Sequence, residues 1–558
     1  MSTKAWRGLL ASFVVAMAAQ RTGSGTTARQ AQYPLHHGRR HRLDAAQHLS
    51  PRPDGRRNPN IDRIGKEGAM FVDYVAMQSC TSGRNAFFTG MYPLRTGMIP
   101  PQLPGSPSYL RPGTPAIAKF LYDLGYTTGE FGKTTLGDHT AALPTAHGFQ
   151  EYWGYLYHLD AMQQVSFPDI NKNPNVQGVA PPCKNTPIPG VPEVPGAVDP
   201  KTTRCLTPPR PVLWCKSSDG TEKNQNCSDE GPLTLDRSRS VDEEISAKVV
   251  DFLDRNDPKK TGKPFFVWYN PARMHVVTVL SPKYEAMLGE RGGKDWGVNE
   301  AGHEADGRQH RRRAQETRDH GPARQYHRRL HHRQWCRGDL LPDGGVTPFK
   351  GQKGEAWEGG YRAPMVVRWP GHIKPGTVHS QLFAALDWVP TLVDIAGGPK
   401  GEGLKKQIEG GQYPGIVKTT LDGVNQRDYL EGKSEKSARD YFYYFSGATP
   451  SAVRYKNWKM YYTMSQPGPA GWIMPLTTFH FTLVQNIKRD PFEQAVGVEQ
   501  KSAMSLGGAL GAPMTAFQYD WNMLPIGQQL WLEHLSSYEN TRRCRRRKAT
   551  TSLRSWSR

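Results

Sequence analysis

The sequence predicts an α/β fold with a smaller second domain, and two observations lead to the first part of this prediction. Short apolar runs that are typical of buried strands alternate with longer segments whose apolar residues recur at helical spacing. The clearest strand-like runs are residues 127–131, 264–269 and 365–369. The clearest helix-like segments are residues 114–126, 241–254 and 379–396. Strands and helices that alternate in this way build a sheet with helices on its faces.

A third observation, a change of pattern after about residue 405, predicts the second domain. Aromatic residues then gather in two strand-like runs, 441–445 and 458–462, and residues 521–532 are typical of a closing helix. We therefore expect a large domain over residues 58–405 and a smaller α+β domain over residues 406–540.

The N-terminus is typical of an export signal. Lys4 and Arg7 precede an apolar run from Leu9 to Ala19, and Ala16-Met17-Ala18 offers a small-residue cleavage site. The run is too short to span a bilayer, so we expect no stable membrane insertion. Residues 1–19 are predicted to be a signal peptide, and the protein is predicted to be periplasmic or secreted. The alternative is an N-terminus that is wrongly assigned.

Cysteine usage also favours an oxidising compartment. The chain has seven cysteines, and four of them lie in a Pro- and Gly-rich segment, residues 165–235: Cys183, Cys205, Cys215 and Cys227. No C-x-x-C spacing occurs among them, which argues against a zinc site and permits disulfides. The sequence leaves the pairing open, and we expect the segment to be a surface insertion near a cleft.

The formal net charge of +21 comes almost entirely from three short basic runs. These runs are residues 29–57, 304–340 and 541–558, and together they carry eighteen of the excess positive charges. Such a charge would ordinarily suggest a nucleic-acid partner. The runs lack the interleaved aromatic residues of a single-strand binding surface, however, so we expect no nucleic-acid partner.

The first ordered segment leads towards Cys80. Residues 20–57 show no helical or strand periodicity, whereas a helix start near Pro59 is followed by apolar residues at helical spacing. These apolar residues are Ile61, Ile64, Ala69 and Phe71. Residues 71–75 then have the composition of a strand. A strand, a turn and a helix would place Cys80 at the C-terminal edge of a sheet, where helix N–H groups face anions.

The stretch Cys80-Thr81-Ser82-Gly83-Arg84, followed by a short apolar segment and Thr89-Gly90, resembles the arylsulfatase signature C-x-[PSA]-x-R. The resemblance covers most of residues 58–303 and 342–535. It implies the large mixed sheet of the alkaline phosphatase-like hydrolases, with residues 58–405 as the catalytic domain. It also implies that Cys80 is oxidised to formylglycine, whose hydrate attacks the sulfur of a sulfate ester and then expels sulfate. Taken alone, Cys80 would more often be a buried structural thiol.

The resemblance assigns a role to Arg84 and to two lysines. Arg84 would stabilise the charged formylglycine hydrate, and Lys133 and Lys353 would hold the oxygens of the sulfate group. Lys133 lies in a match to the family motif G-K-x-H-L-G, but Thr135 stands where the family has His. Lys353 precedes Trp357-Glu358-Gly359-Gly360, a match to the second family signature. A lysine in a turn is otherwise usually a solvated side chain.

Two histidines also fall in matching segments. His275 follows the buried run 264–269, and a His at this place could protonate the leaving oxygen of the ester. Without the family match, a satisfied structural His would be equally expected there. His147 lies in the matching segment 141–158, and we expect it to be structural.

The metal site that the resemblance implies is incomplete. The family binds a divalent ion, normally calcium, beside the nucleophile, and formylglycine at Cys80 would be one ligand. Carboxylate and amide oxygens would supply the rest, from two adjacent Asp residues after the first strand and from a later D-N-G motif. Neither motif is present, and the basic sequences at residues 36–42 and 331–336 stand in their places.

A displaced reading frame accounts for both replacements. Possible codons for residues 30–47, read one nucleotide later, can encode K-P-N-I-L-F-I-M-G-D-D-I-G-W-M-Q-P-S. The same step through residues 325–337 gives N-T-I-V-V-Y-T-T-D-N-G-A-E, in which Arg333 becomes Asp and Gln334 becomes Asn. Residues 542–551, read one nucleotide earlier, can give P-P-L-Q-A-P-E-S-Y-N.

Residues 20–57, 304–340 and 541–558 are therefore predicted to be out of frame, through sequencing errors or a damaged gene. The alternative is a divergent member of the family, whose basic cluster binds sulfate but no metal, because Arg cannot coordinate a cation. In the chain as written, polar sequence replaces two central strands, so we expect it to fold poorly.

These features predict a sulfuric ester hydrolase that cleaves small-molecule sulfate esters, aryl sulfates above all, outside the cytoplasm. A formylglycine-generating or other sulfatase-maturating enzyme is the implied partner. One alternative is a phosphate or phosphonate ester hydrolase of the same superfamily. Another is an inactive sulfatase-like protein or pseudogene product that lacks the metal site.

Overall fold

The computed structural model of the protein describes residues 9–12, 59–162 apart from 101 and 103–105, 197–198, 205–206, 210–289 apart from 272, 274 and 276–278, 301, 327–331, 348–467, 471–493 and 521–538. The three basic runs lie outside these residues, apart from the strand at 327–331. The predictions for residues 20–57 and 541–558 are therefore not addressed by the structure.

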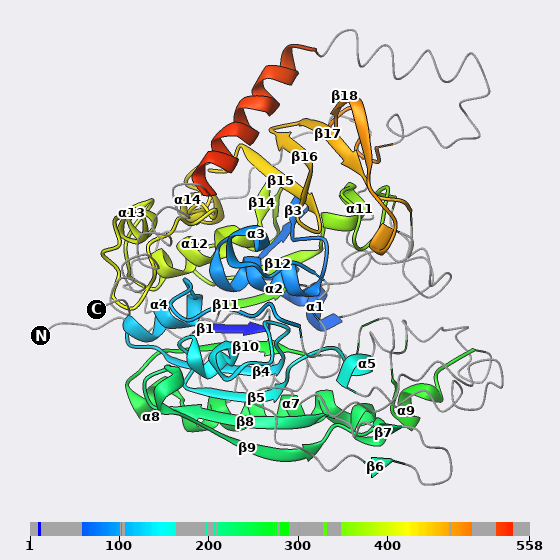
Figure 1. The fold of residues 1–558 in the computed structure, drawn as a ribbon. Coiled ribbons are helices and arrows are strands. Elements are labelled where there is room, and N and C mark those ends of the chain that lie inside the picture. The colour runs from blue at the N-terminus through cyan, green and yellow to red at the C-terminus, as the bar shows by residue number, and fades with distance from the viewer. Residues whose placement is uncertain are drawn as a thin grey trace, which may run out of the picture.

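A ten-stranded mixed sheet forms the centre of the molecule (Figure 1). Its strands, in spatial order, are β13 (Thr377–His379), β2 (Ala69–Phe71), β12 (Met365–Arg368), β11 (His327–His331), β1 (Leu9–Ser12), β10 (Phe265–Asn270), β4 (Thr127–Lys133), β5 (Glu151–Tyr155), β8 (Pro211–Ser217) and β9 (Gln225–Pro232). The five strands from β11 to β5 are parallel, whereas β12 and β8 run antiparallel to the strands beside them. The predicted α/β fold with a large mixed sheet is confirmed.

The alternation of side chains along β10 shows why this strand is apolar throughout. Phe266 and Trp268 belong to the core on one face of the sheet, together with residues of α2, α4 and α12. Phe265, Val267 and Tyr269 belong to the core on the other face, together with residues of α7. A strand that is buried on both faces reads as a continuous apolar run, because successive side chains point to opposite faces.

The longer helices that cover the sheet are α1 (Pro59–Lys66), α2 (Cys80–Thr89), α4 (Ile117–Asp123), α7 (Leu235–Arg255), α12 (Trp388–Ile395) and α13 (Gly403–Gly410). Other short α-helices in the described residues are single turns: α3 (Pro93–Thr96), α5 (Leu159–Met162), α8 (Pro258–Thr261), α9 (Pro282–Glu285), α11 (Glu358–Tyr361) and α14 (Arg427–Leu430). No helix in the described part of the chain is long and apolar enough to cross a membrane.

The C-terminal part forms a separate four-stranded antiparallel sheet, as expected. Its strands are β15 (Tyr441–Ser446), β16 (Thr449–Tyr455), β17 (Trp458–Met464) and β18 (Thr477–Asn486), in that spatial order. Residues 524–538 form the closing helix, drawn in red in Figure 1. Trp531 of this helix packs on Tyr443 of β15 at a ring-centroid distance of 4.8 Å, which fixes the helix to the small sheet.

Two secondary-structure predictions are wrong in part. The predicted helix over residues 379–396 begins only at Trp388, because Phe383 and Ala384 form strand β14, which pairs with β3 (Tyr74–Val75). Ala69 was assigned to the amphipathic helix at Pro59, but α1 ends at Lys66 and Ala69 lies in β2, together with Phe71, which was also predicted to begin a strand. In each case the strand partner is distant in the sequence, so local spacing alone favours a helix.

The Pro- and Cys-rich segment is in part a strand pair rather than a surface loop. Its second half forms β8 and β9 at one edge of the main sheet, and Cys215 and Cys227 lie opposite each other and form a disulfide. Cys205 lies in the short strand β7 (Cys205–Leu206), which pairs with β6 (Ala197–Val198). Cys183 lies outside the described residues.

The N-terminal run that was predicted to be a signal peptide occupies a central place in the sheet. Residues Leu9–Ser12 form β1, which is parallel to β10 on one side and to β11 on the other. Cleavage after Ala18 would remove this strand from the mature protein.

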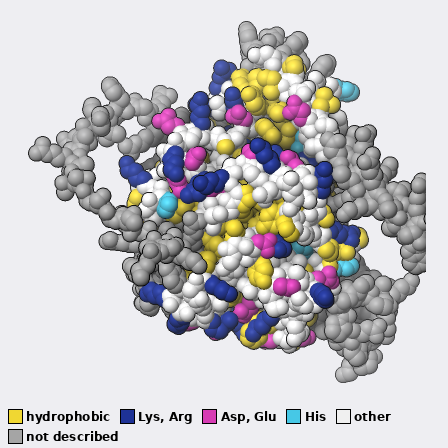
Figure 2. Space-filling model, turned by 90° about the vertical axis from the view of Figure 1, so that its left-hand side faces the viewer, with side chains coloured by type: hydrophobic (Ala, Val, Ile, Leu, Met, Phe, Trp, Pro, Cys, Tyr) yellow, Lys and Arg dark blue, Asp and Glu magenta, His cyan; other side chains and the backbone are white. Residues whose placement is uncertain are grey.

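The described surface carries no continuous basic region on the face that Figure 2 shows. Lys and Arg side chains are interspersed there with Asp and Glu side chains. The even mixture agrees with the near-neutral charge of the chain outside its three basic runs.

Candidate active site

Helix α2 begins at Cys80, so the thiol sits in the first turn of a buried helix. Ser82 caps this end, because its hydroxyl accepts the backbone N–H of Ser79 at 3.1 Å. The other end is closed by Gly90 with φ +69°, a left-handed conformation that favours glycine. Its backbone N–H donates to the carbonyl of Ala86 at 3.0 Å. The residues Thr89-Gly90 of the motif therefore end the helix that presents Cys80.

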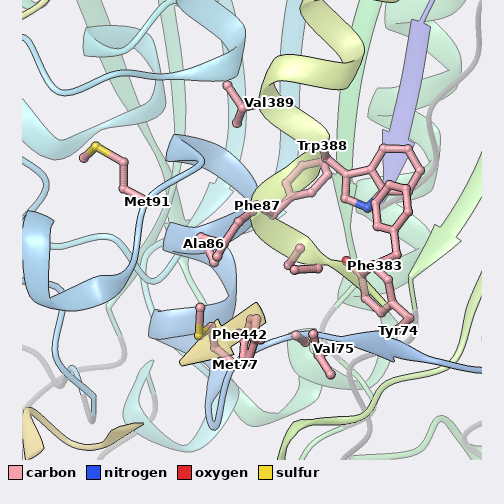
Figure 3. Close-up of a cluster of buried hydrophobic side chains, with 14 of the residues drawn as sticks. Tyr74, Val75, Met77, Ala86, Phe87, Met91, Phe383, Trp388, Val389 and Phe442 are labelled. Carbon is pink, nitrogen blue, oxygen red and sulfur yellow. The ribbon is translucent and has the colours of Figure 1, made fainter. Parts of the chain in front are cut away.

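The apolar side of α2 anchors it to the core. Figure 3 shows Ala86 and Phe87 on the side of α2 that faces α12, beside Tyr74, Phe383 and Trp388. Cys80 itself is only partly buried, unlike the nine residues that follow it in the helix. The strand before it, β3, pairs with β14, so the sheet that directly precedes Cys80 in the chain is this two-stranded sheet and not the ten-stranded one.

Arg84 lies one turn after Cys80 and is buried. Its Nη1 donates to the backbone carbonyl of Lys133 at 2.5 Å, and its guanidinium lies 5.9 Å from the ring centroid of Trp268. Burial lowers the pKa of Arg84, while the nearby Cys80 and Glu130 oppose this shift. The hydrogen bond to Lys133 ties α2 to the end of β4.

Lys133 is the last residue of β4, and the segment after it is held against the segment after β5. The N–H groups of Thr134 and Thr135 donate to the carbonyls of Tyr155 and Leu156 at 3.2 Å and 2.8 Å. Thr135 has φ +65°, an unusual backbone conformation for a β-branched residue, and it is about 1% exposed. Strained residues of this kind gather at functional sites.

The turn that carries Lys353 is tied directly to the Cys80 segment. The N–H of Gly354 donates to the carbonyl of Gln78 at 2.9 Å, and the hydroxyl of Tyr361 donates to the Gln78 side chain at 3.0 Å. Gly360 follows in α11, where an added Cβ would stand 2.2 Å from the Glu355 carbonyl oxygen. Only glycine fits this close approach of two backbone segments, which explains the Gly-Gly of the second motif.

His275 is brought to the same place from the end of β10. Two residues before it, Arg273 anchors the chain on α7, since its backbone N–H donates to Asp242 at 3.0 Å and its guanidinium donates to Glu243 at 2.7 Å. The Nε2 atom of His275 then lies 3.4 Å from Nζ of Lys353. The predicted apolar run 264–269 is therefore strand β10, which ends at Asn270, five residues before His275.

The charges around Cys80 favour an anion at this position. Burial alone would raise the pKa of the Cys80 thiol, but Lys353, Lys133 and a hydrogen bond to His275 lower it well below its usual range. The structure thus brings Cys80, Arg84, Lys133, His275 and Lys353 together, all five of the residues that the motifs predict. Their combined positive charge suits an oxyanion or the anionic form of a nucleophile.

Two further histidines, His147 and His158, lie in this region, and only His147 belongs to a segment that the sequence predictions covered. His147 is structural as expected: its Nε2 lies 2.8 Å from the Ala141 carbonyl, and burial lowers its pKa to about 4. His158, which lies outside the sequence motifs, stacks on His275 with ring centroids 4.8 Å apart and planes 16° apart. The aromatic run that ends at Tyr157 could have indicated His158, because His158, like His275, follows a buried aromatic segment.

The described residues do not fit the metal ion that the motifs imply. Among them, no group of three or more His, Cys, Asp or Glu side chains is arranged to hold a metal. The side chains that surround Cys80 are cationic or imidazole groups, and ammonium and guanidinium groups cannot coordinate a cation.

Comparison with known proteins places the chain in one family. A family model described as Sulfatase matches residues 44–317 and 316–398. Arylsulfatase G of Homo sapiens is 27% identical over 468 residues, which cover 80% of this chain and 78% of that protein. Arylsulfatase A of Bos taurus is 29% identical over 423 residues, which cover 71% and 67% of the two chains.

Solved structures agree in fold. The PsFucS1 sulfatase from Pseudoalteromonas sp. superposes with a TM-score of 0.64 at 20% identity, covering 87% of this chain and 85% of that one. The Ps i-CgsB structure gives a TM-score of 0.54 at 21% identity. With the family model, the relatives and the fold in agreement, the chain belongs to the sulfatase family and is a sulfuric ester hydrolase of the alkaline phosphatase-like superfamily.

Proposed function

We propose that this sulfatase cleaves aryl sulfate esters through a formylglycine made from Cys80. The observation that carries the proposal is the position of Cys80, partly exposed at the start of α2 and faced by Lys133, Lys353 and His275. A maturation enzyme that oxidises the thiol carbon to an aldehyde is the partner that this proposal requires. Arylsulfatase G and arylsulfatase A, as similar proteins, support the choice of an aryl ester.

The proposed reaction uses the hydrate of the aldehyde as nucleophile. One hydroxyl of the hydrate attacks sulfur, and the S–O bond to the alcohol breaks as His275 gives a proton to the leaving oxygen. The second hydroxyl then loses its proton, the C–O bond to the sulfate breaks, and the aldehyde forms again. Lys133 and Lys353 hold the sulfate oxygens through both steps, and Arg84 stabilises the charge of the hydrate.

We propose a calcium ion only for the protein that the displaced reading frame would encode. The in-frame residues do not fit a metal, but residues 325–337 read one nucleotide later would carry Asp at 333 and Asn at 334, oxygen ligands of the kind that calcium prefers. The topology supports this frame. Strand β11 ends at His331 and is parallel, through β1, to β10, so the carboxyl end of β11 lies at the sheet edge that also receives His275.

Export remains part of the proposal, in the periplasm or outside the cell. The N-terminal run has the composition of a signal peptide, and its place as β1 would be free after cleavage. In the displaced frame, residues 32–37 encode N-I-L-F-I-M, an apolar run of strand length. We propose that this run, and not Leu9–Ser12, is the strand between β10 and β11 in the mature protein.

The proposal is tested by co-expressing the chain with a formylglycine-generating enzyme and following the hydrolysis of 4-nitrophenyl sulfate. Mass spectrometry of the peptide that contains Cys80 reports its conversion to the aldehyde independently of turnover. Cys80→Ala should abolish hydrolysis, whereas the exposed-surface variant Lys406→Met should not change it. Faster hydrolysis of a phosphonate monoester than of the sulfate ester would instead support the rival superfamily activity.

Resequencing the coding DNA across codons 28–58 and 303–341 tests the frame. Single-nucleotide slips that restore the D-D and D-N-G motifs would support a calcium-dependent enzyme. An unchanged sequence would make the chain an inactive member of the family, despite its intact Cys80 motif.

A further inference from the structure

We propose that Glu493 is a positioning residue, which together with Lys459 holds the turn that carries Lys353 and so fixes the ammonium group of Lys353 at the sulfate site. We call residues 349–358 the Lys353 turn. The inference rests on the proposed function, in which Lys353 holds sulfate oxygens. It adds a residue from the C-terminal part of the chain that neither motif contains.

The backbone of the Lys353 turn is closed on itself on both sides of Lys353. The N–H of Glu355 donates to the carbonyl of Gln352 at 3.0 Å, and the N–H of Gly359 donates to the carbonyl of Lys350 at 2.8 Å. Helix α11 begins one residue before Gly359. A shift at the start of α11 is therefore passed through the turn to Lys353.

The side of the turn that faces Cys80 has its own contacts. The N–H of Gly354 donates to the carbonyl of Gln78 at 2.9 Å, and Nζ of Lys353 lies 3.4 Å from Nε2 of His275. These contacts fix one end of the turn, and the position of the ammonium group depends also on where the other end, at α11, is held.

Glu493 holds the α11 end of the turn through its side chain. The carboxylate belongs to a residue that is 0% exposed, and its Oε2 accepts the backbone N–H of Glu358, the first residue of α11, at 2.7 Å. Its Oε1 accepts Nζ of Lys459 at 2.8 Å and also the hydroxyl of Tyr461. Three donors on one buried carboxylate leave it a single orientation.

Lys459 and its neighbours hold the side chain of Glu358 in the same way. Nζ of Lys459 and the hydroxyl of Tyr444 donate to Oε1 of Glu358 at 2.9 Å and 2.7 Å, and Nε of Arg362 donates to Oε2 at 2.7 Å. Lys459 thus bridges two carboxylates, one in α11 and one after β18. The small sheet, which lies beside α11 in Figure 1, therefore holds both the backbone and the side chain at the start of this helix.

The segment that contains Glu493 contacts both ends of the Lys353 turn. The ring of Phe492 packs on Phe349, with ring centroids 5.6 Å apart and planes 61° apart. Glu493 itself has φ +55°, a left-handed conformation that is uncommon for a residue other than glycine. Such strain persists only where the surroundings determine the conformation, and it gathers at functional sites.

Two variants separate the position of the turn from the charge of the cluster. Glu493→Asp keeps the charge and suits a left-handed backbone, but its carboxylate is one methylene too short to reach Glu358 and Lys459 together. The double variant Glu493→Gln with Lys459→Met keeps the reach and removes one negative and one positive charge. Its amide oxygen can accept the Glu358 N–H, and its amide N–H can donate to the Tyr461 hydroxyl.

Inorganic sulfate is the probe, and calorimetry well below the melting temperature measures its dissociation constant at constant ionic strength. The variants are made in the full chain as written and with residues 30–47 and 325–337 in the displaced frame, so that a folded protein is available. We expect Glu493→Asp to weaken sulfate binding about tenfold, because a misplacement of about 1 Å can cost up to about a hundredfold. The double variant should stay within about threefold of the wild type, since an ion pair replaced as a pair is often neutral.

The KM for 4-nitrophenyl sulfate gives a readout that a loss of stability alone does not change. Lys353 holds sulfate oxygens before and during the reaction, so its displacement in Glu493→Asp should raise KM more than it lowers kcat. Partial unfolding would instead lower the apparent kcat and keep KM, because the folded fraction would carry wild-type sites.

Arg427→Met is the matched control, because it removes ion pairs elsewhere in the same part of the chain. Nη1 of Arg427 binds Asp394 of α12 at 2.7 Å, and its Nε binds Glu431 at 3.3 Å. This variant should lower the melting temperature and leave the sulfate affinity and KM unchanged.

The outcomes distinguish this inference from the proposed function. Wild-type affinity and KM in Glu493→Asp would overturn the role of Glu493 and leave the proposed function intact. An equal loss of affinity in Arg427→Met would show a general loosening and would also overturn it. A double variant that binds sulfate more weakly than Glu493→Asp would make charge decisive, not position, and would overturn it as well. If the wild-type protein binds no sulfate, the proposed anion site itself fails, and the inference fails with it.

Discussion

Strands β10 and β11 lie on either side of β1 in the same sheet, yet their sequences have opposite character. β10 reads Phe-Phe-Val-Trp-Tyr-Asn and is fully buried. β11 reads His-Arg-Arg-Leu-His, although β12 and β1 pair with it on both sides. Central strands of parallel sheets are normally apolar, because helices cover both faces. Possible codons of β11, read one nucleotide later, can encode I-V-V-Y-T, which suits such a strand.

A second comparison concerns the basic residues. In the C-terminal part of the chain, three buried cations face carboxylates: Arg439 binds Asp387, Arg454 binds Asp73, and Lys459 binds Glu358 and Glu493. In the three basic runs, Lys and Arg outnumber Asp and Glu by eighteen. The difference indicates that a folded core has constrained the described domains, and that the basic runs are not under the same constraint.

Restoring the reading frame is the strongest test of this difference between the described domains and the basic runs. Replacing residues 30–47 and 325–337 by their displaced-frame sequences should turn a poorly folding chain into one that unfolds cooperatively. Calcium at about a hundred times its dissociation constant should then add about 2.7 kcal/mol to the free energy of unfolding. Denaturant unfolding with and without calcium measures both effects.

The control for frame restoration keeps Arg at position 333 and restores everything else. It should fold but should lose the calcium-dependent stabilisation. The opposite outcome, a chain as written that is soluble, melts cooperatively and binds calcium, would remove the argument for a displaced frame.

Much of the fold could be predicted because the relevant signals are local. The apolar runs of β4, β10 and β12, and the helix period of α7, are each contained in one short stretch. What failed depended on distant partners. Residue Asp387, for example, accepts the N–H of Ala384 at 2.9 Å and binds the guanidinium of Arg439, and this arrangement starts α12 later than the apolar spacing suggests.

The second prediction tests whether the buried charges that link Lys459 of β17 to Glu358 of α11 and to Glu493 stabilise the protein. Lys459 is 0% exposed and donates to Glu358 at 2.9 Å and to Glu493 at 2.8 Å. Lys459→Met would leave two carboxylates facing each other, and we expect a loss of about 3–5 kcal/mol in the free energy of unfolding. Urea titration is the measurement.

The matched control for Lys459 is Lys406→Met, on the exposed side of α13, which should change stability by less than about 0.5 kcal/mol. Equal effects of the two substitutions would show that the buried pair contributes no more than a surface charge.

The candidate site shows a similar division between local and distant signals. Cys80, Lys133, Lys353 and His275 each stand in a motif or directly after an apolar run, and the parallel strands bring them to one edge. His158 was missed because its strand, β5, is short and contains Gly154, a residue that weakens a strand pattern. Its stacking on His275 is a tertiary contact that no spacing rule gives.

The third prediction concerns acid stability and uses the buried His147. Burial lowers its pKa in the folded protein to about 4 from the ordinary 6.5, so the folded state binds this proton less tightly than the unfolded state. The stability that follows is complete above about pH 6.5 and is lost as the pH falls towards 4. At about 1.4 kcal/mol per pKa unit, the loss from this group approaches about 3 kcal/mol.

His147→Gln should flatten the fall in unfolding free energy between pH 6.5 and pH 4, because an amide that donates to the Ala141 carbonyl does not titrate. His480→Gln, at an exposed position, should keep the wild-type profile. If the unfolding free energy of His147→Gln falls with pH as steeply as that of the wild type, the acid sensitivity arises from other groups in the domain.

The smallest effect expected is at the end of the helix that presents Cys80. Gly90 has φ +69°, and an added Cβ would lie 3.0 Å from the Val389 side chain. Gly97 has φ +79°, but nothing lies within 4 Å of an added Cβ. Gly97→Ala therefore measures backbone strain alone, about 1–2 kcal/mol, whereas Gly90→Ala adds the contact with α12. If the two substitutions lower the free energy of unfolding in urea by the same amount, α12 can move away from α2 to accept the added methyl group. The packing between these two helices would then be less rigid than the structure indicates.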